Sequence, residues 1–319
     1  MGEIMDQELT FGVTTRQDLS WSDLVKRWRY IETLGFDKVF LPDHVVSVLA
    51  PKQPMMDSWT AIAALATQTE RIRFGVHVTN VLFRNPILLT KQIVTVDHIS
   101  NGRLELAFGS GNAAPSYGVA GIDAGTITER IARLSEVTEL IDGLLRSDAT
   151  TYEGRYYRVK DAVMYPAPVQ TPRPPLAVAA HRAGALKVAA AYADTWDSFG
   201  GFGIPSEESL RLTRERSEKL DEFITSIGRD PRRIARSFFA GLTKDDLWSS
   251  KDAFCDFIGR YREIGITEFN FMWPRADQLG VFEQVASDVI PNLRASSPYA
   301  PRLLIGKDHT RVRRATVFL

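Results

Sequence analysis

The sequence predicts an α/β fold, a closed (β/α)8 TIM barrel with an insertion segment between strands 4 and 5. Short apolar runs alternate with helical patterns along most of the chain, eight of each. Most of the apolar runs end in small or polar residues, as strands do where a barrel carries its functional loops. The chain has 319 residues, of which 44% are hydrophobic, and this is enough for one large core. A doubly wound open sheet is the alternative, but it usually contains fewer units in this order.

The expected helices are recognised by their ends. Gly35 stops the first helix in the C-terminal position that glycine favours, and Asp57 is a good N-cap for the second. Pro86 opens the third helix, where a missing N–H costs nothing, and Thr126 and Glu129 form a capping box. The expected helices are Trp21–Leu34, 57–65, 86–100, Ile127–Leu145, Ala183–Ala191, Glu207–Ile227, Lys251–Ile264 and Asp277–Leu293. The expected strands are Leu9–Val13, Lys38–Leu41, Ile72–Val78, Leu104–Phe108, Leu176–Ala180, Thr195–Phe199, Arg236–Ala240 and Phe269–Met272.

Two segments fit no strand–helix unit. Residues 147–175 contain a hairpin pattern at Tyr152–Tyr156 and then a proline-rich run, which can form neither a helix interior nor a central strand. We interpret them as an insertion within a single domain of residues 1–295. Residues 296–319 form a basic extension, which we expect to be a surface segment rather than a binding arm.

Composition excludes several classes of protein. Lys+Arg and Asp+Glu both number 39, and this charge balance argues against a nucleic-acid-binding surface. No apolar stretch is long enough to cross a membrane, and the acidic start does not resemble a signal peptide. The single cysteine, Cys255, fits a reducing compartment. We therefore expect a cytoplasmic protein without nucleic-acid or membrane partners.

The residues that follow the strands form the candidate site. They are largely neutral, rich in hydroxyl and amide groups, and suit a large polar aromatic ligand. The set comprises Thr14, Thr15, Asp43, His44, Thr79, Asn80, Gly109–Asn112, His181, Arg182, Asp197, Ser198, Gly241, Trp273 and Arg275.

His44 is the sharpest candidate for proton transfer, because imidazole titrates near neutral pH. The alternative is a hydrogen-bonded structural histidine. The turn from His181 through Arg182 to Gly184 offers helix N–H groups and a guanidinium to a phosphate. Gly109-Ser110-Gly111 is either a tight turn or a place where backbone approaches a flat ring. No histidine or acidic cluster has metal-ligand spacing, so no metal is expected.

The order of several motifs resembles the bacterial luciferase-like flavin-dependent oxidoreductases. The resemblance covers about residues 9 to 294 and is densest between Thr69 and Gly111. The matching segments are Leu34–Asp37, Asp43-His44, Thr69–Gly75, Asn85-Pro86, Lys91-Gln92, Asp97–Leu104, Gly109–Gly111, Pro166–Gln170 and Ala193–Trp196.

This resemblance implies a TIM barrel that binds FMN, or its 5-deaza analogue coenzyme F420, at the strand ends. It also implies a homodimer formed through the second and third helices, whose apolar residues include Trp59, Ile62, Leu65, Leu88 and Ile93. A non-prolyl cis peptide behind the flavin ring is expected at Asn80-Val81. Asn80, Val81, Gly109, Gly111 and Asn112 are the expected contacts with the ring.

The remaining site residues also follow from the resemblance. The segment from Ala180 to Gly184, with His181 and Arg182, is expected to hold the ribityl phosphate, and His44 matches the catalytic histidine. Relatives that oxidise sugar phosphates with the deazaflavin have a pattern similar to Gly-x-Gly-Glu after strand 4. This chain has Asn112 in the position of the glutamate.

These observations favour a monooxygenase that uses FMN, reduced by a separate flavin reductase, and O2 to oxidise a small organic substrate. The alternative is an F420-dependent oxidoreductase that transfers a hydride. An alternative of another class is a non-catalytic flavin-binding barrel.

Overall fold

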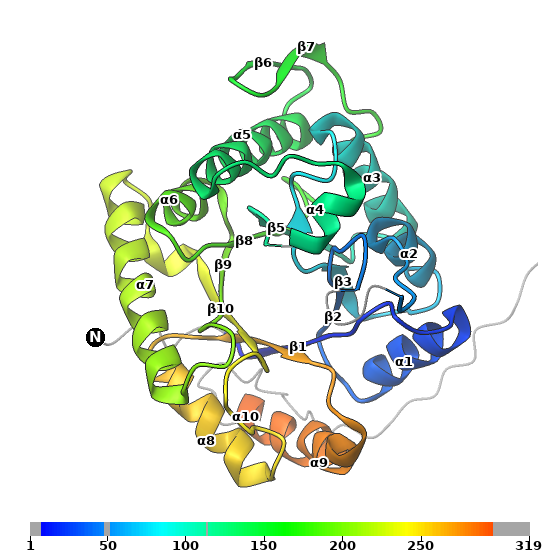
Figure 1. Cartoon of the computed structure of the whole chain (residues 1–319), viewed down its shortest axis with the longest axis vertical. Helices are drawn as coiled ribbons and strands as arrows, with labels where there is room; N and C mark the ends of the chain where they lie inside the picture. The colour runs from blue at the N-terminus through cyan, green and yellow to red at the C-terminus, as the bar shows by residue number, and fades with distance from the viewer. Residues whose placement is uncertain (1–7, 48–51, 113, 296–319) are drawn as a thin grey trace, which may run out of the picture.

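A computed structural model describes residues 8–47, 52–112 and 114–295. β1 pairs with both β2 and β11, and β3 pairs with β5, so the ring of parallel strands is closed (Figure 1). The predicted (β/α)8 TIM barrel is confirmed. Its strands are β1 (Thr10–Thr14), β2 (Lys38–Leu41), β3 (Arg73–Val76), β5 (Leu104–Gly109), β8 (Leu176–Ala179), β9 (Thr195–Ser198), β10 (Ala235–Ala240) and β11 (Glu268–Met272).

Helices surround the barrel (Figure 1). The expected caps are in place: Asp57 accepts a hydrogen bond from the Thr60 N–H, Asn85 caps the helix that Pro86 begins, and Thr126 forms its capping box with Glu129. The helices are α1 (Trp21–Thr33), α2 (Ser58–Leu65), α3 (Pro86–Ser100), α5 (Ile127–Arg146), α6 (Ala183–Tyr192), α7 (Ser206–Ser226), α8 (Lys251–Arg262), α9 (Leu279–Gln284) and α10 (Ile290–Ala295).

The structure departs from the expected elements in three places. The last helix is not continuous, because a π-helical segment, Val285–Val289, separates α9 from α10. The third strand ends at Val76, and the chain turns before a short β4 (Thr79–Asn80). The loop after β5 contains an additional helix, α4 (Ala114–Ala120), too short to give a clear periodic pattern.

The insertion lies outside the barrel. β6 (Thr150–Glu153) and β7 (Arg158–Ala162) pair antiparallel, which confirms the hairpin, and they project beyond α5 in Figure 1. Glu136 of α5 fastens the turn, because its carboxylate accepts the backbone N–H groups of Arg155 and Tyr156 at 2.8 and 2.9 Å. The expected basic extension, 296–319, lies outside the described residues. No helix in the described ranges is both long and apolar enough to span a bilayer.

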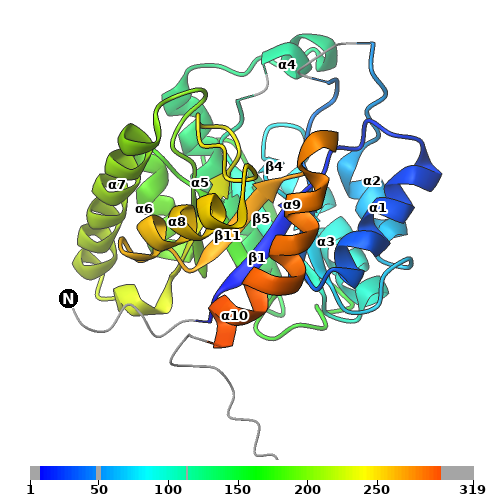
Figure 2. The same ribbon diagram turned by 90° about the horizontal axis from the view of Figure 1, so that it is seen from below.

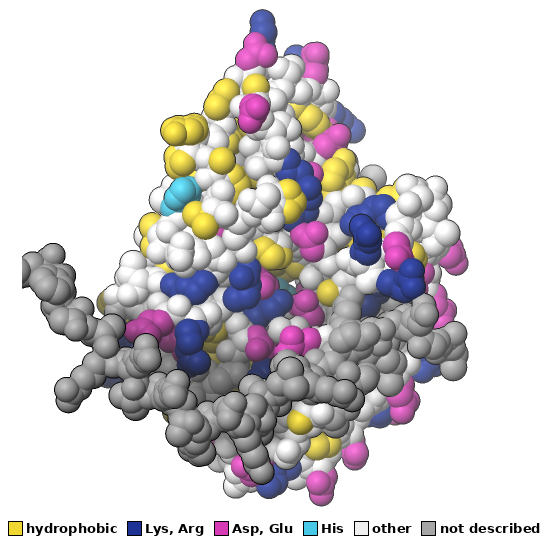
Figure 3. Space-filling model, turned by 180° about the vertical axis from the view of Figure 1, so that it is seen from behind, with side chains coloured by type: hydrophobic (Ala, Val, Ile, Leu, Met, Phe, Trp, Pro, Cys, Tyr) yellow, Lys and Arg dark blue, Asp and Glu magenta, His cyan; other side chains and the backbone are white. Residues whose placement is uncertain are grey.

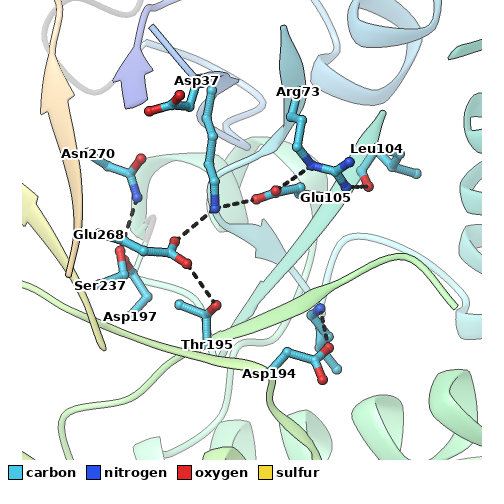
Figure 4. A network of polar contacts seen from close by, with 12 residues as sticks. Asp37, Arg73, Leu104, Glu105, Asp194, Thr195, Asp197, Ser237, Glu268 and Asn270 are labelled. Atoms are coloured by element: carbon cyan, nitrogen blue, oxygen red, sulfur yellow. Dashed lines mark hydrogen bonds and ion pairs between the residues drawn. The ribbon is translucent and has the colours of Figure 1, made fainter. Parts of the chain in front are cut away.

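The main core lies between the strands and the helices, whereas the inside of the barrel is polar. Lys38 is buried there, with its ammonium 2.8 Å from Glu268 and 2.9 Å from Glu105 (Figure 4). Burial by itself lowers the pKa of Lys38, but the two carboxylates outweigh it and the pKa is raised. Gly12 makes room for Asn270, since a Cβ at Gly12 would lie 2.1 Å from the Asn270 amide oxygen. The charges inside the barrel are therefore paired.

Candidate active site

The residues expected after the strands meet at one end of the barrel. Asn80 of β4 pairs with Gly109 of β5, and the Asn80 N–H donates to the Asp43 carboxylate at 3.0 Å. A Cβ built on Gly111 would lie 2.7 Å from the Asn80 side-chain oxygen. Figure 2 shows α4 over this end of the barrel. The ends of β2, β4 and β5 thus form one continuous site.

Asp43 is the centre of the polar contacts at this site. Its buried carboxylate accepts the Ser58 hydroxyl at 2.7 Å and the Asn80 backbone N–H. Both terminal nitrogens of Arg84 also donate to it, and Arg84 contacts Asp57 as well at 2.9 Å. A buried carboxylate needs this many donors to replace its water. Asp43 therefore ties the end of β2 to α2 and to the loop before α3.

The short helix α4 is held on the site by two side chains. The Ser116 hydroxyl accepts the backbone N–H groups of Val45 and Val46 at 3.0 and 3.4 Å. The Tyr117 hydroxyl accepts the Asn80 side-chain NH2 at 3.0 Å. α4 therefore contacts both the segment that carries His44 and the loop between β3 and α3.

His44 follows Asp43 and lies half-buried under this contact. Burial lowers the pKa of His44, and the charge of Asp43 opposes that shift only in part. The imidazole is therefore neutral at neutral pH. Its Nδ1 atom is buried and has no hydrogen-bond partner within the described part of the chain. A neutral imidazole with a free ring nitrogen can accept or donate a proton.

The loop after β3 forms a bulge against β5. The non-prolyl cis peptide is His77-Val78, so the prediction of Asn80-Val81 is wrong. The Asn80-Val81 peptide instead joins the β4 pairing, where the Val81 N–H donates to the Gly109 carbonyl at 3.4 Å. Val78 packs directly on Gly109, where a Cβ would lie 2.5 Å from a Val78 methyl group.

The residues predicted to contact the flavin ring differ in whether their side chains are already buried or hydrogen-bonded within the protein. The Asn80 amide is already occupied by Tyr117 and by the Leu82 N–H, and Val81 is buried in the core. Gly111 has φ +80°, and Asn112 after it is exposed. Asn112 therefore remains available to a ligand, whereas the side chains of Asn80 and Val81 serve the fold.

The residues predicted to hold the phosphate of the cofactor lie at the start of α6. Arg182 is the N-cap residue and is exposed, without a capping hydrogen bond from its side chain. His181 is mostly buried, and its Nε2 accepts the Phe199 N–H at 3.2 Å. Burial, and then the charge of Arg216, lower the pKa of His181 to about 4. Gly184 allows α6 to approach α5, because a Cβ there would lie 3.0 Å from an Ile131 methyl group.

Several buried polar atoms at the strand ends have no partner among the residues described. Besides His44 Nδ1, they are Thr14 Oγ1, Gln17 Oε1, Thr79 Oγ1 and Ser198 Oγ. Buried polar groups in proteins are nearly always satisfied, so such a group of unsatisfied atoms indicates a place that a polar ligand or water completes. No cluster of three or more His, Cys, Asp or Glu in the described residues is arranged for a metal ion.

Sequence reasoning missed the residues that build the site around His44. Asp43 belongs to the expected set of strand-end residues, but no polar network is predicted around it from the sequence, although a buried acid directly after a strand is itself a signal for one. Arg84 could have been found as the cation in the loop that faces this acid. Ser116 and Tyr117 could not, because nothing in the sequence indicates that α4 folds back over the barrel.

A TIM barrel whose strand ends carry a neutral histidine, a glycine-lined bulge and unsatisfied polar atoms is typical of an enzyme with a ligand-binding site at that end. Residues 8–268 match the profile of the luciferase-like monooxygenase family. The chain belongs to this family, and the predicted resemblance is confirmed. It is therefore an enzyme of the oxidoreductase class.

The curated relatives of this chain include several that are named for coenzyme F420. The F420-dependent glucose-6-phosphate dehydrogenase of Amycolatopsis mediterranei is 28% identical, over 86% of this chain and 95% of that protein. The enzyme of the same name from Intrasporangium calvum is also 28% identical, over 85% and 95% of the two chains.

Solved structures confirm the fold. The coenzyme F420-dependent tetrahydromethanopterin reductase of Methanopyrus kandleri superposes with a TM-score of 0.75 at 18% identity, covering 90% of this chain and 99% of that one. The monooxygenase RslO1 of Streptomyces bottropensis gives a TM-score of 0.71 at 18% identity, covering 89% and 100%.

The contact between Gly111 and Tyr117 gives a test of the site's construction. A Cβ at Gly111 would lie 1.9 Å from the Tyr117 hydroxyl, and the positive φ adds strain. We expect Gly111→Ala to lower the free energy of unfolding by about 1–3 kcal/mol in chemical denaturation. The matched control is Gly118→Ala in α4, where a Cβ meets nothing within 4 Å. Equal effects of the two substitutions would contradict this account of α4.

Proposed function

We propose that this protein is an F420-dependent oxidoreductase that moves a hydride between the deazaflavin and a substrate carbon. The observation that carries the proposal is His44, neutral and with an unpartnered Nδ1 among the strand ends. The curated relatives named above support the deazaflavin over FMN. The expectation of an FMN monooxygenase, with O2 and a separate reductase, thus becomes the second candidate.

The residues at the strand ends fit such a cofactor. The bulge at His77-Val78, whose valine packs on Gly109, would support one face of a flat ring. Arg182 and the N-terminal N–H groups of α6 would hold the phosphate. The unsatisfied hydroxyls of Thr14 and Ser198 are free to donate to ring or chain oxygens. When bound, the deazaflavin would supply hydride acceptance and donation.

His44 would move the proton that accompanies the hydride. Oxidation of an alcohol requires a base for the hydroxyl proton, and a neutral imidazole is ready to accept it at Nδ1. Asp43 fixes the Asn80 backbone, and α4, which is hydrogen-bonded to the segment after His44, would limit the access of water. Asn112 cannot act as an acid, although it occupies the position of the glutamate in the sugar-phosphate pattern. His44 is therefore the proposed proton carrier.

Cofactor binding separates the proposal from its alternatives. We expect the purified chain to bind oxidised F420 with a micromolar dissociation constant, at least about tenfold more tightly than FMN, in fluorescence titrations. Tighter binding of FMN, with turnover that needs O2, would favour the monooxygenase instead. Binding of F420 without turnover of any alcohol or carbonyl compound would favour a non-catalytic barrel, and failure of both cofactors to bind would refute the flavin-type function.

The role of His44 is tested by replacing it. We expect His44→Gln to lower kcat about 10²- to 10⁴-fold while the F420 dissociation constant stays within about twofold. In the wild type, alcohol oxidation should decline as the pH falls through the lowered pKa of His44, below 6.5, because protonation removes the base. The control is His98→Gln, since His98 lies on α3 and contacts the Ala167 carbonyl. Unchanged turnover of His44→Gln would make His44 structural.

We also propose a homodimer, formed through a surface on α3. Of the apolar residues expected at this interface, Trp59, Ile62, Leu65 and Ile93 are buried within the chain itself. Leu88 is exposed, and with other exposed apolar side chains of α3 and the insertion it forms what we call the α3 patch. Hydrophobic side chains gather on this side in the upper left of Figure 3. The α3 patch consists of Leu88, Ile99, Val163, Tyr165 and Val169.

The insertion contributes to the α3 patch because it is bound to α3. The Lys91 ammonium donates to the Tyr165 carbonyl at 2.9 Å, and the Val169 N–H donates to Asp97 at 2.8 Å. Exposed apolar side chains that adjoin one another indicate an interaction surface.

Sedimentation equilibrium should give twice the chain mass of 35.7 kDa. The double variant Leu88→Asp/Tyr165→Asp should sediment as a monomer, because it places charge in the interface. Ile227→Asp, at the end of α7, is the control and should remain a dimer. A wild-type monomer, or a double variant that still dimerises, would contradict the α3 interface.

A further inference from the structure

We infer that the substrate is an uncharged, largely apolar alcohol or carbonyl compound rather than a sugar phosphate. This inference rests on the proposed function and narrows it to a class of substrate. It differs from the substrate in the names of the curated F420-dependent relatives, which is glucose 6-phosphate. It is carried by two properties of the strand-end face, the exposed apolar side chains around it and the engagement of its cations.

Three of the strand-end connections each present an exposed apolar side chain. Val45, directly after His44, is 41% exposed, and Val119 on α4 is 66% exposed. Phe202, in the connection from β9 to α7, is 67% exposed. We call these three side chains the apolar rim. Val45 and Val119 lie on segments joined through Ser116, so two members of the rim belong to one structural unit beside His44.

Phe202 continues a row of rings that starts at the site. His181 meets the Phe199 ring edge-to-face, with centroids 4.5 Å apart, and Phe199 meets Phe202 at 5.4 Å. The glycines on either side of Phe202 have positive φ values, so the backbone turns there to bring the ring outwards. An exposed phenylalanine costs free energy in water, and an apolar substrate that covers it would recover that cost.

Three of the cations at the same face are engaged. Arg84 is bound by Asp43 and Asp57, and Arg275 by Asp277. Arg27 lies 4.6 Å above the Trp273 ring and donates to the Thr15 hydroxyl.

Of the cations that remain, Arg130 at the start of α5 donates to the Gly125 carbonyl at 3.2 Å, and its buried Nε has no partner among the residues described. The connections at 110–126 and 199–205 contain no Lys or Arg at all. Lys244 lines a separate cleft together with Asp245 and Asp246. Arg182 is assigned to the cofactor phosphate, and Lys52 is exposed on the connection after β2.

A sugar phosphate requires a different surface. Enzymes hold phosphate oxygens with unpaired Arg or Lys side chains and with free helix N–H groups. At this site one such arrangement, Arg182 and the start of α6, would be taken by the cofactor. Asn112 also replaces the acid of the sugar-phosphate pattern. The remaining surface therefore favours carbon chains over charged groups.

Calorimetry with two probes tests the inference in the absence of deazaflavin. We expect 2-octanol to bind with a dissociation constant at least about tenfold lower than that of glucose 6-phosphate. The double variant Val119→Ser/Phe202→Ser should weaken 2-octanol binding about tenfold and leave the weak binding of glucose 6-phosphate unchanged. Both residues are exposed, so the variant should keep the wild-type melting temperature. Ile227→Ser, which changes an exposed apolar residue at the far end of α7, is the matched control.

Two results would overturn the inference. One is tighter binding of glucose 6-phosphate than of 2-octanol, and the other is 2-octanol binding that the double variant does not weaken. Failure of the proposed function has a different signature, because F420 would then fail to bind or to react while 2-octanol still bound at the apolar rim.

Discussion

The structure of the site depends on the buried carboxylate of Asp43. A charged group out of water must be surrounded by donors, and here they come from Ser58 of α2, from the backbone of β4 and from Arg84. Two segments, the start of α2 and the connection from β4 to Arg84, are thus fixed to the end of β2. His44 is the next residue, so its ring position follows from this constraint. Loss of the carboxylate would leave Arg84 half-paired and release the loop that forms the bulge.

A second layer of charge lies deeper in the barrel. Lys38, Glu105 and Glu268 fill the space that a TIM barrel usually closes with branched apolar side chains (Figure 4). Closer to the strand ends, His77 Nε2 lies 3.2 Å from the Asp197 carboxylate, although its ring is turned away from the line of a hydrogen bond. The strand-end side of the barrel therefore rests on a polar interior whose charges are mutually paired.

Much of the fold could be predicted from the sequence, because strands and helices alternate regularly and carry clear caps. Gly35, Asp57 and Pro86 each mark an end that the structure confirms. The failures occur where tertiary contacts override local pattern. The cis peptide lies at His77-Val78 rather than at Asn80-Val81, and Asn80 is held by Asp43 and Tyr117 rather than left free for a ligand. α4 is short and rich in small residues, and its position depends on distant hydrogen bonds that no local motif records.

The central claim is that the cofactor binds beside a neutral His44 with a free Nδ1. Nitrogen NMR of the histidine side chains tests it most directly, with oxidised F420 added to the labelled protein. The signals of His44 should report a neutral ring at neutral pH and should shift on binding, while those of His98 on α3 stay unchanged. Binding of F420 that leaves His44 unshifted would contradict the account.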